Sequence, residues 1–506
     1  MLSCYQKLKN TKFLFRRGIM SKTQKKDFYN LHLLIGLLIM LFFRFLPIQL
    51  PSVTPLGMNI LGIFIGTLYL WTTFDTIVSS IISIFLVGLS GYGAMNEILT
   101  STFGNPILVQ VLFLLTAINC LIENNLTEYC GRFFLTRKVC LGRPWVLAFF
   151  IMVGCMLMGA FMGGFTPIFL FCPILYDIFE TVGLKKHDKF PTIMLILVTI
   201  ATLLGFPVPP FMGNGLALIS NYATLTGNMG TVIEINNAGY LAVGLIHSMV
   251  CIIILVLFCK YVLRPDTSKL KNLTMEDLNK NPLPPMSTQQ KFVAISFTAF
   301  ILLLLVPSIF PTHPVGKFVK ANTYGIAALY VAILCAVRIN KKPIMDLPTT
   351  MKRFSWSSYF IIAAAILLGS ALTNEKTGVS AFLNTVLMPI LEKVPTPAFA
   401  SIVMLLTVVL TNVCNSFVIG LLLQPVIATF CMATGVNSAP IVAMMILFVL
   451  SSAAVTPAAS PFAALMFGNK EWLDSKEIYK YSLIFVAIEL VIVLFISMPV
   501  ASALIK

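Results

Sequence analysis

The stretch TNVCNSFVIGLLLQP (411–425) gathers the polar side chains of Asn412, Cys414, Asn415 and Ser416 in its first half, inside an apolar segment. Buried polar groups cost free energy unless they are hydrogen-bonded. Asn supplies an NH2 donor and an amide oxygen, and Ser supplies a hydroxyl. Such donors can replace the water around a carboxylate or sulfate, and the amide oxygen can ligate a hard cation such as Na+. Ordinary hydrogen bonding between membrane helices is the alternative interpretation.

A second polar stretch, AVTPAASP (454–461), interrupts the next apolar segment. Its prolines remove backbone donors, and such a break at membrane depth survives only inside protein or beside a cavity. Thr456 and Ser460 offer hydroxyls there, while Ala458 and Ala459 offer freed backbone carbonyls. A proline kink without a binding site is the alternative.

Two stretches of the first half are weaker counterparts, MGGFTP (162–167) and GFPVPPFMGNG (205–215). Their side chains are mostly apolar, so contact with an ion would have to be made largely through the backbone. Glycines that only permit a tight turn are the alternative here.

Two ionisable residues, His247 and Glu489, lie in the middle of apolar segments. Ionisable groups at membrane depth are functional hypotheses by default. Both are therefore candidates for proton coupling. A neutral side chain hydrogen-bonded to a neighbouring helix is the alternative for each.

The composition indicates a membrane protein. Of the 506 residues, 58% are hydrophobic and 11% are charged, and mean hydropathy is +0.92. Continuous apolar runs long enough to cross a bilayer as helices predict an all-α polytopic membrane protein and argue against a β-barrel. The net charge of +16 is attributed to cytoplasmic loops and not to nucleic-acid binding. The eleven cysteines contain no CxxC pair and are interpreted as small buried hydrophobes.

Eleven spanning helices and two interrupted apolar segments are predicted. The spans are placed at 30–49, 57–73, 75–93, 104–123, 190–227, 238–263, 291–310, 321–338, 356–373, 438–468 and 478–503. The interrupted segments, 145–181 and 396–433, are predicted to be re-entrant hairpins. The spans 190–227 and 438–468 are expected to break at the two proline-containing stretches.

The basic residues predict the orientation. With the N-terminus inside, 29 of the 35 Lys and Arg residues fall on cytoplasmic segments. Those segments are 1–30, 128–143, 182–189, 260–291, 338–355 and 469–480. The chain is therefore expected in the cytoplasmic membrane, with its N-terminus inside and its C-terminus outside. No cleavable signal is expected, and either Met1 or Met20 can be the start.

The order of elements repeats, and it predicts four regions. These are a basic N-terminus (1–29), a first transmembrane half (30–264), a cytoplasmic linker (265–290) and a second half (291–506). The repeated order starts at 57 in the first half and at 291 in the second, and each copy has five full spans, an odd number, so the halves are expected to be inverted. Inverted repeats with discontinuous helices are typical of secondary transporters, which hold substrate where the breaks meet.

At this point the sequence resembles the divalent anion:sodium symporter family. CNSFVIGLLLQPV (414–426) is similar to that family's Ser-Asn-Thr hairpin tip, and TPAASPFAALMFGN (456–469) is similar to its second helix break. PSVTPLGMNILGIFIGTLYLWTTF (51–74) and STFGNPILVQVLFLLTAINCLIENNLTEYCGR (101–132) resemble first-half segments of the family.

The resemblance implies an elevator-type transporter in which a transport domain slides against a dimeric scaffold. It implies substrate contacts at Cys414, Asn415, Ser416, Ser460, Thr166 and Gly164. It also implies Na+ ligation at Asn415, Ala459 and Gly205. The first tip departs from the family, because Gly163, Gly164 and Phe165 stand where the family has Ser-Asn-Thr.

The predicted function is cation-coupled symport, with Na+, of small organic anions such as dicarboxylates. No enzyme activity and no cofactor are expected, and the expected partners are a small anionic solute, the lipid bilayer and a second copy of the chain. The alternatives are a cation/proton antiporter, or a proton-coupled anion carrier that uses Glu489 or His247.

Overall fold

The computed structural model describes residues 22–47, 50–211, 213–274, 283–352, 354–379, 381–382, 385 and 394–505. Met20, most of the predicted N-terminal segment, the middle of the predicted linker and most of residues 380–393 lie outside these residues.

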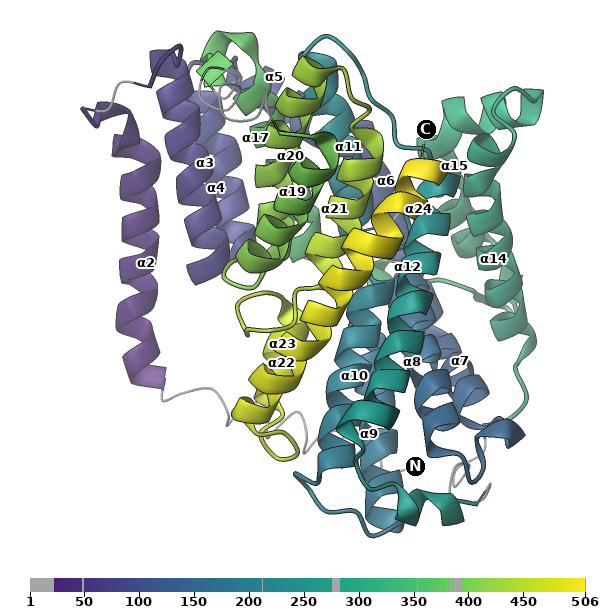
Figure 1. Ribbon diagram of the computed structural model, residues 1–506. Coiled ribbons are helices and arrows are strands. Elements are labelled where there is room, and N and C mark those ends of the chain that lie inside the picture. Colours follow the sequence, from purple (N-terminus) through teal and green to yellow (C-terminus); the bar gives the residue numbers. More distant parts are fainter. Residues whose placement is uncertain are drawn as a thin grey trace.

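The described chain is almost entirely helical (Figure 1). The first half contains α2 (Lys22–Phe42), α3 (Pro55–Thr73), α4 (Thr76–Leu89), α5 (Met95–Phe103), α6 (Pro106–Glu123), α7 (Leu126–Leu135), α8 (Pro144–Phe161), α9 (Thr166–Thr181), α10 (Lys189–Gly205), α11 (Gly213–Asn228) and α12 (Asn237–Phe258). The second half contains α14 (Thr288–Ile309), α15 (Pro314–Ala336), α16 (Leu347–Met351), α17 (Trp356–Thr373), α19 (Thr396–Thr411), α20 (Ser416–Thr434), α21 (Ala439–Ser451), α22 (Pro461–Gly468), α23 (Ser475–Ile492) and α24 (Met498–Leu504).

Short elements complete the fold. The 3-10 turns are η1 (Phe43–Phe45), η2 (Lys138–Cys140), η4 (Ser268–Asn272) and η5 (Glu375–Thr377), and the π-helical turns are η3 (Cys259–Leu263) and η6 (Val493–Ser497). One small addition to the predicted helical fold is an antiparallel hairpin of β1 (Arg338–Ile339) and β2 (Lys342–Pro343). Its turn residues, Asn340 and Lys341, both have positive φ, as a tight two-residue hairpin turn requires.

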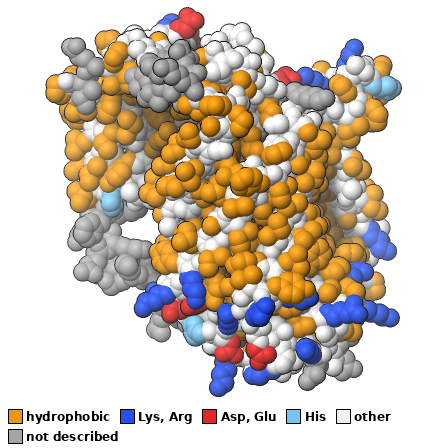
Figure 2. Space-filling model, viewed as in Figure 1, with side chains coloured by type: hydrophobic (Ala, Val, Ile, Leu, Met, Phe, Trp, Pro, Cys, Tyr) orange, Lys and Arg blue, Asp and Glu red, His pale blue; other side chains and the backbone are white. Residues whose placement is uncertain are grey.

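By length and composition, eight of the described helices can cross a membrane. They are Pro55–Thr73, Pro106–Glu123, Pro144–Phe161, Asn237–Leu263, Thr288–Ile309, Pro314–Ala336, Ser416–Thr434 and Ser475–Leu504. In Figure 2, hydrophobic side chains cover the middle of the visible face, and most of its Lys and Arg gather at the lower end. The predicted polytopic helical membrane protein is confirmed at this level.

Local sequence explains where several helices begin. Proline occupies the first turn of α3 and α6, where its missing N–H is not needed. The preceding residues cap these helices, because Thr54 accepts from Gly57 N at 3.1 Å and Asn105 accepts from Ile107 N at 2.9 Å. These contacts satisfy N–H groups that a helix start would otherwise leave unpaired.

Both long segments predicted to break do so. The 190–227 segment divides into α10 and α11, and the 438–468 segment divides into α21 and α22. The helix before each break is unusually buried: every residue of α21 is buried, and so is every residue of α10 after Lys189. A helix that is apolar on all sides belongs in the interior of a large protein. The breaks are thus held at the centre of the molecule.

The two interrupted segments form helical hairpins. The first, α8 and α9, occupies the lower half of Figure 1, and the second, α19 and α20, occupies the upper half. Close packing fixes the first hairpin against α10, since a Cβ on Gly159 would lie 2.7 Å from Thr202 O. Small residues permit this close approach of helix backbones.

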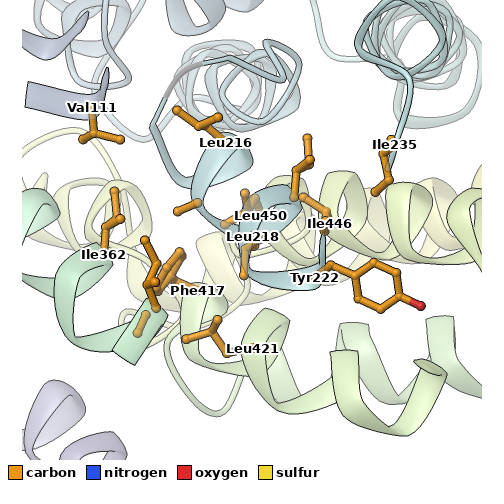
Figure 3. Close-up of a cluster of buried hydrophobic side chains, with 14 of the residues drawn as sticks. Val111, Leu216, Leu218, Tyr222, Ile235, Ile362, Phe417, Leu421, Ile446 and Leu450 are labelled. Carbon is orange, nitrogen blue, oxygen red and sulfur yellow. The ribbon is translucent and has the colours of Figure 1, made fainter. Parts of the chain in front are cut away.

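A buried apolar cluster surrounds α11 (Figure 3). Leu218 and Tyr222 of α11 gather there with Phe417 of α20 and Leu450 of α21. This cluster fixes α20, and therefore the start of that helix, against both broken helices.

Candidate functional site

The tip of the second hairpin lies between the end of α19 at Thr411 and the start of α20 at Ser416. Asn415 caps α20, because its Oδ1 accepts from Phe417 N at 3.0 Å. Ser416 is buried, whereas Cys414 and Asn415 are partly exposed. The three residues predicted from the sequence therefore stand together at a helix N-terminus, which favours anions.

Asn412 fastens this tip to the second helix break. Its Nδ2 donates to Ser452 O at 3.0 Å, and its Oδ1 accepts from Val455 N at 2.8 Å. Its own backbone carbonyl accepts from Thr456 Oγ1 at 2.7 Å. Asn412 thus positions the tip, in agreement with the plainer of its two sequence interpretations.

The break itself is closed by Ser460. Its hydroxyl donates to Ala453 O at 2.6 Å and accepts from Ala463 N at 3.1 Å, which caps α22. The carbonyl of Ala459, one residue earlier, accepts from Ser416 N at 3.2 Å. Two helix N-termini, those of α20 and α22, therefore meet at one backbone hydrogen bond. Their positive dipole ends and N–H groups converge on the same place.

The tip of the first hairpin has a different character. Thr166 Oγ1 donates to Met162 O at 3.0 Å, within the hairpin. Gly164 is buried, and a Cβ added there would lie 2.4 Å from the ring of Phe462. The Phe165 ring lies 4.7 Å from the Phe462 ring, measured between centroids. The first tip therefore packs on an aromatic ring of the second half.

Gly205 ends α10, where the first break begins. Its carbonyl accepts from Val208 N at 3.0 Å. A Cβ at Gly205 would lie only 1.9 Å from Met156 O of α8, so glycine is required here by close packing. The other freed carbonyl of this break, that of Pro207, accepts from Tyr240 OH at 3.0 Å. The first break is thus closed by contacts within the protein.

The two ionisable residues meet. His247 of α12 and Glu489 of α23 come from different halves of the chain, and His247 Nε2 lies 3.3 Å from Glu489 Oε1. His247 Nδ1 lies 2.9 Å from Ser497 Oγ, and Ser451 Oγ donates to Glu489 Oε1. Sequence reasoning found both ionisable residues but predicted neither their contact nor the two serines.

The sequence analysis also missed Phe462 and the buried pair Asn221 and Gln424. Gln424 lies in the opening stretch as a lone amide among leucines, which was a visible signal. Phe462 carried no such signal, because it is one of 40 phenylalanines. Among the described residues, no group of three His, Cys, Asp or Glu side chains is placed to hold a metal ion.

Buried helix breaks, hairpin tips joined to them and apolar outer helices together define a polytopic membrane transporter. Comparison with known proteins agrees. The family model described as citrate transporter (CitMHS) matches residues 66–467, and the chain belongs to that family. The predicted resemblance is confirmed, and the comparisons identify a transporter and not an enzyme.

Two individual relatives are informative. The sodium-dependent high-affinity dicarboxylate transporter 3 of Caenorhabditis elegans is 26% identical over 210 residues, or 37% of this chain. The match spans 36% of that relative's length, about a third. The crystal structure of the YdaH transporter of Alcanivorax borkumensis matches 80% of this chain and 88% of its own, with a TM-score of 0.56. At 14% identity this likeness shows a shared fold.

Proposed function

We propose that the protein is a Na+-coupled symporter of small organic carboxylates. The observation that carries the proposal is the hydrogen bond from Ser416 N to Ala459 O, where the capped N-termini of α20 and α22 meet. The sodium-dependent dicarboxylate transporter among the relatives supports both the cation and the substrate class.

The anion is held by the second tip. Asn415 uses its Oδ1 to cap α20, which leaves its NH2 group as a donor for a carboxylate. Cys414 and Ser416 are its neighbours in the chain, and Ser460 follows Ala459, whose carbonyl accepts from Ser416 N. Positive helix ends favour the negative charge of the substrate without placing a fixed cationic side chain in the membrane.

The cation is held by oxygens of the same region. Asn415 Oδ1 and Ala459 O each accept one hydrogen bond, and a carbonyl oxygen has a second lone pair that can face Na+. Gly205 O is the corresponding oxygen of the first half, but its glycine is already explained by packing against Met156. We therefore place the main cation site in the second half.

The opposite side of the substrate is apolar. Phe165 and Phe206 both contact the Phe462 ring, with centroid distances of 4.7 and 5.1 Å. Phe462 follows Ser460 by two residues, so this aromatic group adjoins the polar break. The substrate class is a carboxylate with one anionic end and a smaller or more apolar other end, which contacts Gly164 and Thr166 of the first tip.

The architecture proposed with this function has eleven spans, two re-entrant hairpins and inverted halves (30–264 and 291–506), joined by the linker 265–290. The hairpins approach from opposite ends of the molecule (Figure 1), as re-entrant hairpins of inverted halves do. The gathering of Lys and Arg at one end (Figure 2) supports a cytoplasmic membrane location with the N-terminus inside and the C-terminus outside. Elevator motion of the hairpins and broken helices within a homodimer completes the proposal.

Uptake into proteoliposomes tests the function. Labelled citrate, succinate and short monocarboxylates are offered with and without an inward Na+ gradient, and Na+-stimulated uptake of at least one is expected. Asn415→Ala should abolish that uptake. Asn105→Ala is the matched control, because Asn105 caps α6 through the same side-chain bond at 2.9 Å, and it should retain uptake. Normal uptake by Asn415→Ala would contradict the site assignment. If Na+ stimulates the uptake of none of these carboxylates, the proposed function is wrong.

A further inference from the structure

An ionisable pair lies at the centre of the molecule, outside the anion and cation site described above. His247 and Glu489 are 1% and 2% exposed, and each lies near the middle of a long apolar helical segment, Asn237–Leu263 and Ser475–Leu504. An ionisable pair at such depth is costly to maintain for packing alone. Its position therefore indicates a functional role for the pair.

A π-helical turn brings a third polar group to the pair. Glu489 and Ser497 are eight residues apart, which would place them about 80° apart around a regular α-helix. The π turn η6 (Val493–Ser497) lies between them and absorbs an extra residue, which brings both side chains to the same face. Ser497 Oγ and Glu489 Oε1 consequently reach the two different ring nitrogens of His247, at 2.9 and 3.3 Å.

The pair is connected to the second helix break. Ser451, the last residue of α21, donates its hydroxyl hydrogen bond to Glu489. The next residue, Ser452, receives the Nδ2 bond of Asn412 through its carbonyl at 3.0 Å. Two hydrogen bonds and one peptide unit thus connect Glu489 to Asn412, which fastens the substrate tip.

No other described charge faces the pair. The packed elements α19, α21, α22, α24 and η6 contain no ionisable side chain, and the lysines of α10 and α14 (Lys189 and Lys291) lie in their first turns. On α23 the other charged residues lie between Ser475 and Lys480, at the helix start, and Lys260 lies in the π turn that ends α12. The Cys251 thiol lies 3.8 Å from His247 Nδ1, and α8 carries Cys155.

We propose that His247 and Glu489 form a proton-binding site whose occupancy is transmitted through Ser451 to the second break, so that a proton is bound together with the anion. This inference rests on the proposed function for its anion. In the loading step the Glu489 carboxylate forms an O–H bond with a proton taken from water, and it returns the proton to water on the other side of the membrane. No electron is transferred, and the added positive charge offsets one negative charge of the substrate.

Protonation of Glu489 changes its hydrogen bond with Ser451, the residue that ends α21 before the second break. An ionised Glu489 can only accept, so Ser451 must donate to it. A protonated Glu489 can donate, which releases the Ser451 hydroxyl hydrogen toward Phe448 O, 3.4 Å away. Phe448 O also accepts from Ser452 N and Ser452 Oγ, at 3.0 and 2.6 Å. Protonation of Glu489 therefore changes the hydrogen bonds of the last turn of α21, where the second break begins.

Proton movement is measured in proteoliposomes that enclose a pH-sensitive dye. Adding a carboxylate that the wild type accumulates should acidify the lumen. Glu489→Gln should lose this acidification while it still exchanges labelled carboxylate across the membrane. Carboxylate uptake without acidification in the wild type would overturn the proton site and leave the proposed function intact. Absence of any carboxylate uptake would overturn the proposed function, and the next measurement then decides the proton site by itself.

Infrared difference spectra of the reconstituted protein report the site without transport. A carboxyl C=O band that titrates with pH should be present in the wild type and lost in Glu489→Gln. Ser451→Ala should shift the midpoint of that titration, whereas Ser248→Ala should leave it unchanged. Ser248 adjoins His247, but its hydroxyl donates to Leu204 O at 2.8 Å. Where Glu489→Gln fails to fold, His247→Gln must shift the same midpoint. A band that titrates identically in these variants and the wild type would overturn the proposal.

Discussion

Asn221 Nδ2 donates to Gln424 Oε1 at 2.6 Å, and this bond joins α11 of the first half to α20 of the second. Gln424 is completely buried and donates in turn to Leu218 O at 2.7 Å. The two helices that the bridge joins also contribute Leu218 and Leu421 to the apolar cluster of Figure 3. It fixes α20, the second helix of the second hairpin, to α11, which follows the break of the first half.

Replacing both partners of this bridge should cost less stability than the two single replacements added together. Gln424→Leu leaves the Asn221 amide buried without its acceptor, which costs about 1–3 kcal/mol. The double variant Asn221→Leu with Gln424→Leu removes both polar groups, so its loss should be smaller than the sum of the two single losses. Thermal unfolding of the purified protein in detergent measures these differences. Additive losses would contradict the bridge.

Asn412→Ala should abolish carboxylate uptake although Asn412 touches no substrate in our proposal. The variant loses the bonds to Ser452 O and Val455 N, so the second break is no longer fastened to the tip. We expect a stability loss of about 1–3 kcal/mol as well, because the break's buried groups lose their partner. Uptake assays and unfolding curves are needed together. If uptake per folded molecule stays at the wild-type level, Asn412 does not position the site.

Phe165→Ser should change which carboxylates compete for uptake. In the wild type, monocarboxylates with an apolar end should compete better than succinate, because the first tip presents the Phe165 ring. A hydroxyl at this position provides a donor for a second carboxylate, so succinate should gain relative to the monocarboxylates. Competition against one labelled substrate measures how strongly succinate inhibits uptake relative to the monocarboxylates.

Phe169→Ala is the control for this change, since Phe169 is an exposed aromatic of the same hairpin whose ring centroid lies 6.4 Å from that of Phe165. It should leave the order of competitors unchanged. Preference of the wild type for succinate would rule out an apolar partner at the first tip.

Local sequence was enough to predict both helix breaks and both hairpins, because proline, glycine and small polar residues act on the backbone where they stand. The cap formed by Asn415 follows from the same local chemistry. The contacts of Phe462 with Phe165 and of His247 with Glu489 join residues hundreds of positions apart. Such contacts depend on how the two halves pack, which periodicity and residue type do not encode. The complete burial of α10 and α21 also follows from packing, since their apolar composition equally suits a helix exposed to lipid.

Gly205→Ala separates a packing role from a cation-binding role for Gly205. The added Cβ would meet Met156 O at 1.9 Å, so α8 and α10 must move apart, at a cost of about 1–3 kcal/mol. Because the backbone carbonyl remains, packing predicts the same loss of thermal stability with and without Na+. A ligand role predicts instead that the stabilisation by Na+ becomes smaller, because the separation of α8 and α10 displaces the Gly205 carbonyl and a bound ion stabilises only the folded state. Gly468→Ala is the control, because a Cβ there meets no atom within 4 Å, and it should change neither stability nor its dependence on Na+.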